Sequence, residues 1–259
     1  MAQQTRTPVT SLNSKDLKLT SLRKNKMGRM TAYINNSKTM GKTMYRSPKL
    51  RLPFKVAVKV FDGVPRSSVT MALDNINPDS KYYDPKIEEF RNHLKDIDRM
   101  IINAAANDTQ NWIGRDMSSS SLEERMKKAK EQLNPLVKEG QLNKRTGERY
   151  SELIKMKVYL DESSTPQIPG SAYNDEIEKK DKVPPVMVKH SGKSRQEIPP
   201  EKIIDMLDAN CHVKVTFSFG GVWFKRAGRL QNYGITMILE AIEIFPYNRV
   251  VNVVKTSEF

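Results

Sequence analysis

Three stretches of the chain alternate apolar and polar residues with period two, which predicts β-strands because successive side chains of a strand point to opposite faces. They are residues 54–61, 68–73 and 150–160. Asp62-Gly63, between the first two stretches, is typical of a turn, so these strands are expected to pair with each other.

A long hairpin is predicted near the C-terminal end. Residues 211–219 alternate, whereas in residues 233–245 apolar side chains occupy both faces, as in a central or barrel strand. Residues 220–232 are then expected to be the connection. It carries an aromatic pair, Trp223 and Phe224, directly before a cluster of cations.

Two helices are predicted between the strands. Ile87, Phe90, Leu94, Ile97 and Ile101 recur at helical spacing after Pro85, which indicates a helix over residues 85–106. A second helix should begin after a run of serines at 118–121 and extend to about Gly140, with Pro135 as a kink or end. Residues 186–190 suggest a short strand, and residues 198–207 a brief helix.

About five strands with turns between them, interrupted by a helical block, predict a mainly β fold: a five-stranded OB-like barrel with an inserted α-helical block and a disordered basic N-terminal arm. An open α+β sheet is the competing interpretation. The expected organisation is a flexible arm at 1–44, a binding domain at 45–247, with a helical insertion at about 85–139 and a polar loop at 161–200, and a tail at 248–259.

The charge is concentrated at one end of the chain. The net charge is +14, and residues 1–60 hold 14 Lys and Arg against one acid, Asp16. Such a concentration is typical of a surface that binds a polyanion, nucleic acid above all, although a solvated tail is the alternative. No apolar run is long enough for a membrane helix, no secretory signal is evident, and one cysteine, Cys211, excludes an intrachain disulfide. An intracellular location is expected.

Three predicted strands share a division into an aliphatic face and a face of lysines with an occasional aromatic ring. Single-stranded nucleic acid needs this combination, because cations neutralise phosphates and rings stack on unpaired bases. A half-exposed sheet with ordinary polar outer residues is the alternative. The residues of this second face are Lys55, Lys59 and Phe61, then Lys155, Lys157 and Tyr159, and then Lys214 with His212.

Trp223 and Phe224 are adjacent, so in an extended segment they face opposite sides and only one of them is expected to be core. Which ring is the core one stays open from the sequence. Lys225, Arg226 and Arg229 follow in the same stretch and could contact a phosphate backbone.

An enzyme is the least favoured class. His93, His190 and His212 are far apart and lie in no metal-binding or nucleophile motif, and Cys211 points away from its neighbour His212 in a strand. No catalytic residue, metal or cofactor is expected.

The segment from Val213 to Phe245, with Trp223 ending one strand, a basic connection, and Gly234-Ile235 opening the next, resembles single-stranded DNA-binding (ssDNA-binding) proteins of large nucleocytoplasmic DNA viruses. That family is similar in turn to the OB-fold replication protein of a podophage. A weaker likeness covers residues 45–62. The phage relatives end in an acidic tail with a terminal Phe. This chain ends in Phe259, but its last four residues hold one acid, Glu258.

The resemblance implies non-sequence-specific coating and protection of ssDNA in viral DNA replication, repair or recombination. It further implies viral replication proteins (polymerase, helicase or primase) as partners, with a homo-oligomer as an option, and a place in a cytoplasmic virus factory, the nucleus or the virion. The alternative function is a basic structural nucleoprotein or virion component that binds genome or RNA nonspecifically. The candidate ssDNA-binding residues are Lys49, Arg51, Lys55, Lys59, Lys155, Lys157, Tyr159, Lys214, Trp223, Phe224, Lys225, Arg226, Arg229 and Tyr233.

Overall fold

Five strands close into a ring in the computed structural model, which describes residues 9–39, 43–56, 58–61, 64–160, 166–167, 186–188, 196–198, 207, 209–228 and 230–245. We number the five ring strands one to five in chain order. Around the ring, strand one pairs with two, two with three, three with five, five with four, and four with one. The third and fifth strands run parallel, and the other pairs are antiparallel. The ring strands are β7 (Leu50–Arg51), β9 (Val64–Leu73), β12 (Glu152–Leu160), β16 (His212–Ala227) and β17 (Leu230–Phe245).

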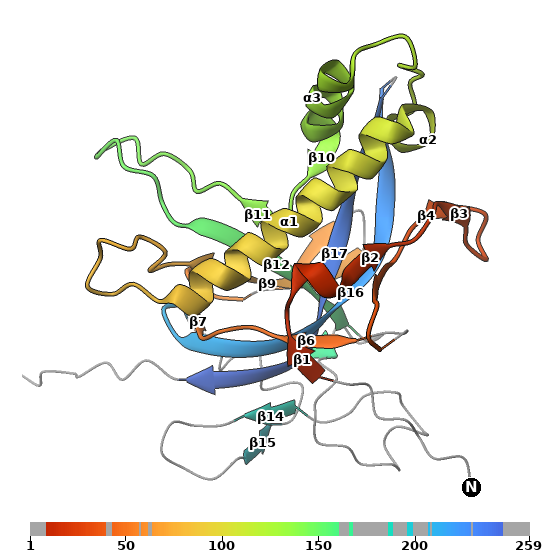
Figure 1. Ribbon diagram of the computed structural model, residues 1–259. Helices are drawn as coiled ribbons and strands as arrows, with labels where there is room; N and C mark the ends of the chain where they lie inside the picture. Colours follow the sequence, from red (N-terminus) through yellow and green to blue (C-terminus); the bar gives the residue numbers. More distant parts are fainter. Residues whose placement is uncertain are drawn as a thin grey trace, which may run out of the picture.

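This closed ring confirms the predicted mainly β, OB-like barrel over the open-sheet alternative (Figure 1). The alternating pattern explains which residues fill it. Met71 of β9, Met156 of β12 and Val215 of β16 are all buried. The alternation is clearest in β12, where the neighbours of Met156, Lys155 and Lys157, are exposed.

The hairpin of β16 and β17 is longer than predicted and projects beyond the barrel as a two-stranded ribbon (Figure 1). Its paired strands continue to Ala227 and Leu230, so the expectation that residues 220–232 form the connection is wrong. Two β-bulges interrupt the pairing, one at Gly220-Gly221 and one at Glu240. Such bulges bend a ribbon and increase its twist.

The helical block lies between β9 and β12 in sequence, as predicted. Helix α1 (Pro85–Asn107) begins at the N-cap Asp84 and buries one stripe, including Phe90 and Leu94, against the barrel. Helix α2 (Thr109–Ile113) follows directly. Helix α3 (Leu122–Gln132) begins with the predicted serine cap, because Ser121 and Glu124 form a reciprocal capping box.

Helix α3 ends earlier than predicted. Instead of continuing to Gly140, the chain becomes extended at Leu133 and adds two short strands to the sheet. β10 (Leu133–Asn134) runs parallel to β17, and β11 (Val137–Lys138) pairs with β12. Pro135 lies between the two strands, where a residue without an amide N–H disrupts neither pairing.

The N-terminal region differs from the sequence prediction, because residues 9–39 fold onto the barrel and are not a disordered arm. Leu12, Leu17 and Ala32 are buried in the main core, and Ser14 donates a hydrogen bond of 2.8 Å to Asp96 on α1. The elements of this region are β1 (Val9–Ser11), η1 (Ser14–Asp16), β2 (Leu17–Leu19), β3 (Arg23–Lys24), β4 (Met30–Thr31) and β5 (Ile34–Asn36), followed by β6 (Met44–Arg46), which pairs with β16.

The strand predicted over residues 54–61 is shorter than expected. Residues 54–56 are not a strand, and only β8 (Val58–Phe61) pairs, in a hairpin with β9. The short strand predicted at 186–190 is present as β14 (Val186–Val188), which pairs with β15 (Gln196–Ile198); β13 (Pro166–Gln167) pairs with the end of β12. The predicted helix at 198–207 and the tail at 248–259 fall largely or wholly outside the described residues.

Candidate nucleic-acid interface

The outer face of β12 presents the predicted basic and aromatic side chains together. Lys155, Lys157 and Tyr159 are all exposed, and the ammonium Nζ of Lys157 lies 4.5 Å from the centre of the Tyr159 ring. On the neighbouring strand β9, the residues opposite the two lysines are Thr70 and Ser68. These β9 neighbours are short, so on that side they leave the two lysines accessible. We call the surface formed by Lys155, Lys157 and Tyr159 the β12 face.

The hairpin of β8 and β9 extends this face. Arg66 of β9 is exposed and pairs with the backbone of Lys59, whose side chain the structure does not describe. Arg66 was missed by sequence reasoning because the second strand was predicted to begin only at residue 68. Phe54 and Val60, expected on one apolar face, are 59% and 67% exposed, so this hairpin edge offers apolar side chains to solvent.

Lys55 is exposed as predicted, but it follows the bend at Pro53-Phe54 and does not lie in a strand. It contributes a cation at the entry to the β8–β9 hairpin. The predicted strand face that it shares with Lys59 involves a side chain outside the described residues.

A second group of predicted residues meets at the start of β16. The Nζ atoms of Lys49 and Lys214 lie 4.4 and 5.7 Å from the centre of the Phe245 ring. His212, directly opposite Phe245 in the strand pairing, has its pKa lowered by burial and by the positive charges of Lys49 and Arg51, against a smaller opposing effect of Asp74. The neutral imidazole is thus favoured beside these cations.

Arg51 is committed to an ion pair. Its Nε and Nη2 atoms donate to the two oxygens of Asp74 at 2.6 and 3.2 Å, and its Nη1 donates to Asn210 at 3.2 Å. Burial alone would raise the pKa of Asp74, but hydrogen bonds from Arg51 and Ser151 outweigh burial and lower the pKa. This arrangement makes Arg51 a brace between β7 and the end of β9, and it occupies the fork with which Arg would bind a phosphate.

The aromatic pair of the ribbon divides between its two faces. The Phe224 ring lies 5.5 Å from Trp112 of α2 and 6.4 Å from Tyr233 of β17, so it packs on the helix side. Trp223 lies on the opposite side, partly exposed, and its ring covers Gly234 of the neighbouring strand. The question left open by the sequence is thereby answered: Phe224 belongs to a core cluster and Trp223 is the surface ring.

Tyr233 was predicted to contact ssDNA, and that prediction is wrong. Its side chain is 0% exposed, and its hydroxyl donates a hydrogen bond of 2.7 Å to the carbonyl oxygen of Ala129 on α3. Burial, with a smaller effect of Asp98, raises its pKa. Lys225 and Arg226 are exposed near the end of the ribbon, as expected, and Arg229 lies outside the described residues.

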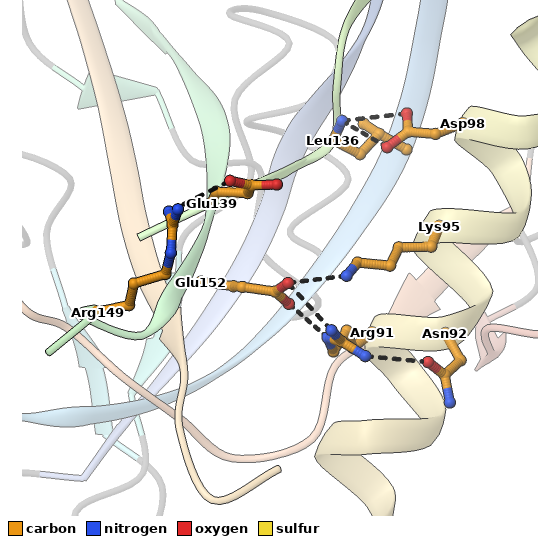
Figure 2. Close-up of polar contacts among 8 residues, drawn as sticks. All are labelled: Arg91, Asn92, Lys95, Asp98, Leu136, Glu139, Arg149 and Glu152. Atoms are coloured by element: carbon orange, nitrogen blue, oxygen red, sulfur yellow. Dashed lines mark hydrogen bonds and ion pairs between the residues drawn. The ribbon is translucent and has the colours of Figure 1, made fainter. Parts of the chain in front are cut away.

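A set of charged contacts fixes α1 to the strands behind it (Figure 2). The carboxylate of Glu152 on β12 accepts hydrogen bonds from both Arg91 and Lys95, the latter at 2.8 Å. Burial alone would raise the pKa of Glu152, but these two cations lower it overall. One turn further along α1, Asp98 accepts hydrogen bonds from the backbone N–H of Leu136 at 3.1 and 3.0 Å. These contacts fix α1 to the end of β12 where Glu152 lies. The helix therefore does not cover the β12 face.

Within the described residues, no group of three or more His, Cys, Asp or Glu side chains is arranged to hold a metal ion. None of the helices in that part of the chain combines the length and the apolar character needed to cross a membrane. The β12 face presents cations and a ring on a strand of a small barrel whose topology is that of an OB fold.

Comparison with known proteins gives similar structures but no sequence relatives. No family model matches the chain, and no curated protein matches it either. Among solved structures, the chain is similar to gp2.5, a ssDNA-binding protein encoded by bacteriophage T7, with 12% identity over 85% of this chain and 99% of that one, at a TM-score of 0.39. It is similar as well to the ssDNA-binding protein of bacteriophage Enc34 in complex with ssDNA, with 14% identity over 77% and 84% of the two chains, at a TM-score of 0.37.

These structural neighbours are phage ssDNA-binding proteins, and the likeness is too remote to assign a function to this chain. The likeness to proteins of large nucleocytoplasmic DNA viruses stays a prediction.

Proposed function

We propose that the protein is a non-enzymatic ssDNA-binding protein that coats and protects ssDNA without sequence preference during viral DNA replication, repair or recombination. The observation that carries the proposal is the β12 face, where two exposed lysines and the 43% exposed ring of Tyr159 stand in a row on the barrel wall. Cations of this kind bind phosphates, and an accessible ring stacks on any unpaired base.

The position of this row in the barrel supports the same function. In OB folds the face of the second and third strands, with the loops between strands one and two and between strands four and five, is the surface that binds oligonucleotides. Here β9 and β12 are the second and third ring strands, and the β8–β9 hairpin and the tip of the ribbon flank them. Lys155, Lys157, Tyr159, Arg66 and Lys225 would then contact one bound strand.

The test uses a pair of variants with identical chemistry at two places. In the full-length chain, Lys157→Gln with Tyr159→Ala removes the lysine and ring of the β12 face. The matched control is Lys81→Gln with Tyr82→Ala, because Lys81 lies 4.9 Å from the Tyr82 ring in an equivalent contact that is outside the barrel wall. Binding of fluorescent oligo-dT is measured by anisotropy at two salt concentrations.

The β12 variant should bind roughly tenfold or more weakly, since stacking on one base is worth about 1–3 kcal/mol. The slope of log K against log salt should become shallower by roughly 0.7, because one lysine no longer neutralises a phosphate. The control should bind like the wild type. Absence of wild-type binding at low salt, a preference for duplex, or equal losses of affinity in both variants would refute the proposal.

A further inference from the structure

The β3–β4 hairpin holds its cations on a fixed turn. The side-chain oxygen of Asn25 accepts hydrogen bonds from the backbone N–H groups of Met27 and Arg29 at 2.9 and 3.0 Å, and Gly28 N–H donates to the Asn25 carbonyl at 2.9 Å. Gly28 has a φ of +73°, a conformation in which glycine alone is unstrained. The turn is thus defined by its own side-chain contacts, and the hairpin is a preorganised structure.

Four exposed cations surround this turn, namely Arg23, Lys24, Lys26 and Arg29. In the described part of the chain none of the four has a carboxylate partner, and the carboxylate before them in sequence, Asp16, is paired with Lys38 at 2.8 Å. Four like charges within seven residues repel one another, so the hairpin carries a strong positive potential that an anionic ligand would relieve.

The hairpin is joined to the edge of the ribbon. Val222 N–H of β16 donates to the carbonyl of Ala32 at 2.8 Å, and the Thr31 hydroxyl donates to the carbonyl of Val222 at 3.0 Å. A Cβ at Gly221 would lie 2.6 Å from Thr31 Oγ1 and 3.2 Å from the Tyr33 ring, so the glycine of the bulge makes this close approach possible. The residues at the end of β4 and directly after it thus lie along the edge of β16, as a further strand-like segment of the ribbon.

Two accessible rings lie beside the cations. Tyr33 is exposed, and the Arg23 guanidinium lies 5.5 Å from its ring centre. A Cβ at Gly221 would lie beside the Tyr33 ring, and Gly221 and Trp223 are two residues apart on β16, so both face the outer side of the ribbon. The backbone positions of Gly221 and Trp223 are about 7 Å apart along the strand. We call the two rings, together with the four cations of the turn, the hairpin surface.

We infer that the hairpin surface is a second ssDNA-binding site, which holds a further part of the same strand that the β12 face binds. The inference rests on the proposed function. Stacking rings beside cations are what unpaired bases and their phosphates require. Strand β17 connects the two surfaces, because Lys157 pairs with Ile238, and Gly234 beneath Trp223 is four residues away on the same strand. That separation is about 13 Å, which a continuous nucleic-acid strand can cross.

The experiment measures binding of full-length protein to oligo-dT of about 8 and about 30 nucleotides, chosen because one OB fold covers roughly 4–16 nucleotides. The hairpin variant carries Lys24→Gln, Lys26→Gln and Arg29→Gln. The matched control removes three exposed cations from the helices, Lys86→Gln, Lys127→Gln and Lys130→Gln, so that both variants have the same net charge.

For the long oligonucleotide, the hairpin variant should bind at least tenfold more weakly than the control, and its slope of log K against log salt should fall by about 2, at roughly 0.7 for each phosphate contact. For the short one, both should bind alike. Tryptophan fluorescence gives a second measurement. Trp112 is 3% exposed, so quenching by the long oligonucleotide should come from Trp223 and disappear in Trp223→Phe.

Equal affinities of the two variants for the long oligonucleotide would overturn the inference. So would equal reductions in affinity on long and short oligonucleotides, or on single strand and duplex of the same length, because these results would show general electrostatic attraction. A wild type that binds the short oligonucleotide and gains nothing from the long one overturns this inference alone. A wild type that binds neither overturns the proposed function as well.

Discussion

The two faces of the β16–β17 ribbon use aromatic side chains in opposite ways. On the helix side, Trp112 lies edge-on to both Phe224 and Tyr233, with ring centres 5.5 and 5.4 Å apart, and this cluster is covered by α2 and α3. On the outer side, Trp223 is partly exposed, and Tyr33 is exposed with the Arg23 guanidinium over its ring. Strand alternation alone separates Trp223 from Phe224, so one short aromatic motif supplies both a core and a candidate binding surface.

The largest expected difference between the two faces is in stability. Trp112→Ala should lower the free energy of unfolding by about 3–5 kcal/mol, because it removes a large buried ring and leaves a cavity. Trp223→Ala should lower it by less than half as much, because its ring is already partly in water. Urea unfolding followed by circular dichroism measures both. Equal decreases would show that the two faces are not distinct.

The pH dependence of stability tests the helix side through Asp98. Burial raises its pKa to about 6, although hydrogen bonds from the backbone N–H of Leu136 and Val137 and the charge of Lys95 oppose this. At pH values between the ordinary pKa of 3.8 and the raised pKa of about 6, the Asp98 carboxyl therefore keeps its proton in the folded state and loses it in the unfolded state. The contribution of this group to stability is thus greatest below that window and is lost as the pH rises through it.

Asp98→Asn removes this titration. The difference in unfolding free energy between wild type and Asp98→Asn should shift against the wild type by roughly 2 kcal/mol from pH 4 to pH 7. Taking the difference cancels the opposite effect of Asp74 and Glu152, whose pKa values are lowered. A difference that does not change with pH would contradict the assignment.

Gly234 tests how the outer ring is seated. A Cβ at this position would lie 2.8 Å from Trp223 Cζ2 and 2.9 Å from the backbone oxygen of Asn134, so Gly234→Ala should cost about 1–3 kcal/mol and shift the Trp223 emission. Gly220→Ala is the control, because its nearest atom is a flexible side-chain carbon of Ile238 at 3.2 Å. The loss of unfolding free energy caused by Gly234→Ala should be smaller when Trp223 is also replaced by Ala. If the loss is unchanged, the added Cβ clashes only with the backbone of Asn134.

The barrel and α1 were predictable from the sequence because their signals are local. Alternation in residues 150–160 and the helical stripe from Ile87 to Ile101 each report which side chains meet the core. The predicted cations and ring of β12 are on the outer face for the same reason. Their role in binding stays a prediction.

Long-range contacts decided the remainder. Leu12, Leu17 and Ala32 have no periodic pattern, and their burial depends on a barrel edge that the sequence around them does not reveal. The Gly220-Gly221 bulge looked like a turn, although both strands continue past it. Arg51 looked like a free cation because its partner Asp74 is 23 residues away.

The smallest expected effect separates burial from binding at Tyr233. Tyr233→Phe removes only the hydroxyl that donates to the Ala129 carbonyl, and it should cost about 1 kcal/mol of unfolding free energy. Tyr33→Phe, on the outer face, should change it by at most about 0.5 kcal/mol. Neither change removes a ring, so affinity for oligo-dT should stay at the wild-type value in both. If Tyr233→Phe weakened binding at unchanged stability, the hydroxyl would have to reach the ligand, and the helix-side face would no longer be a closed core.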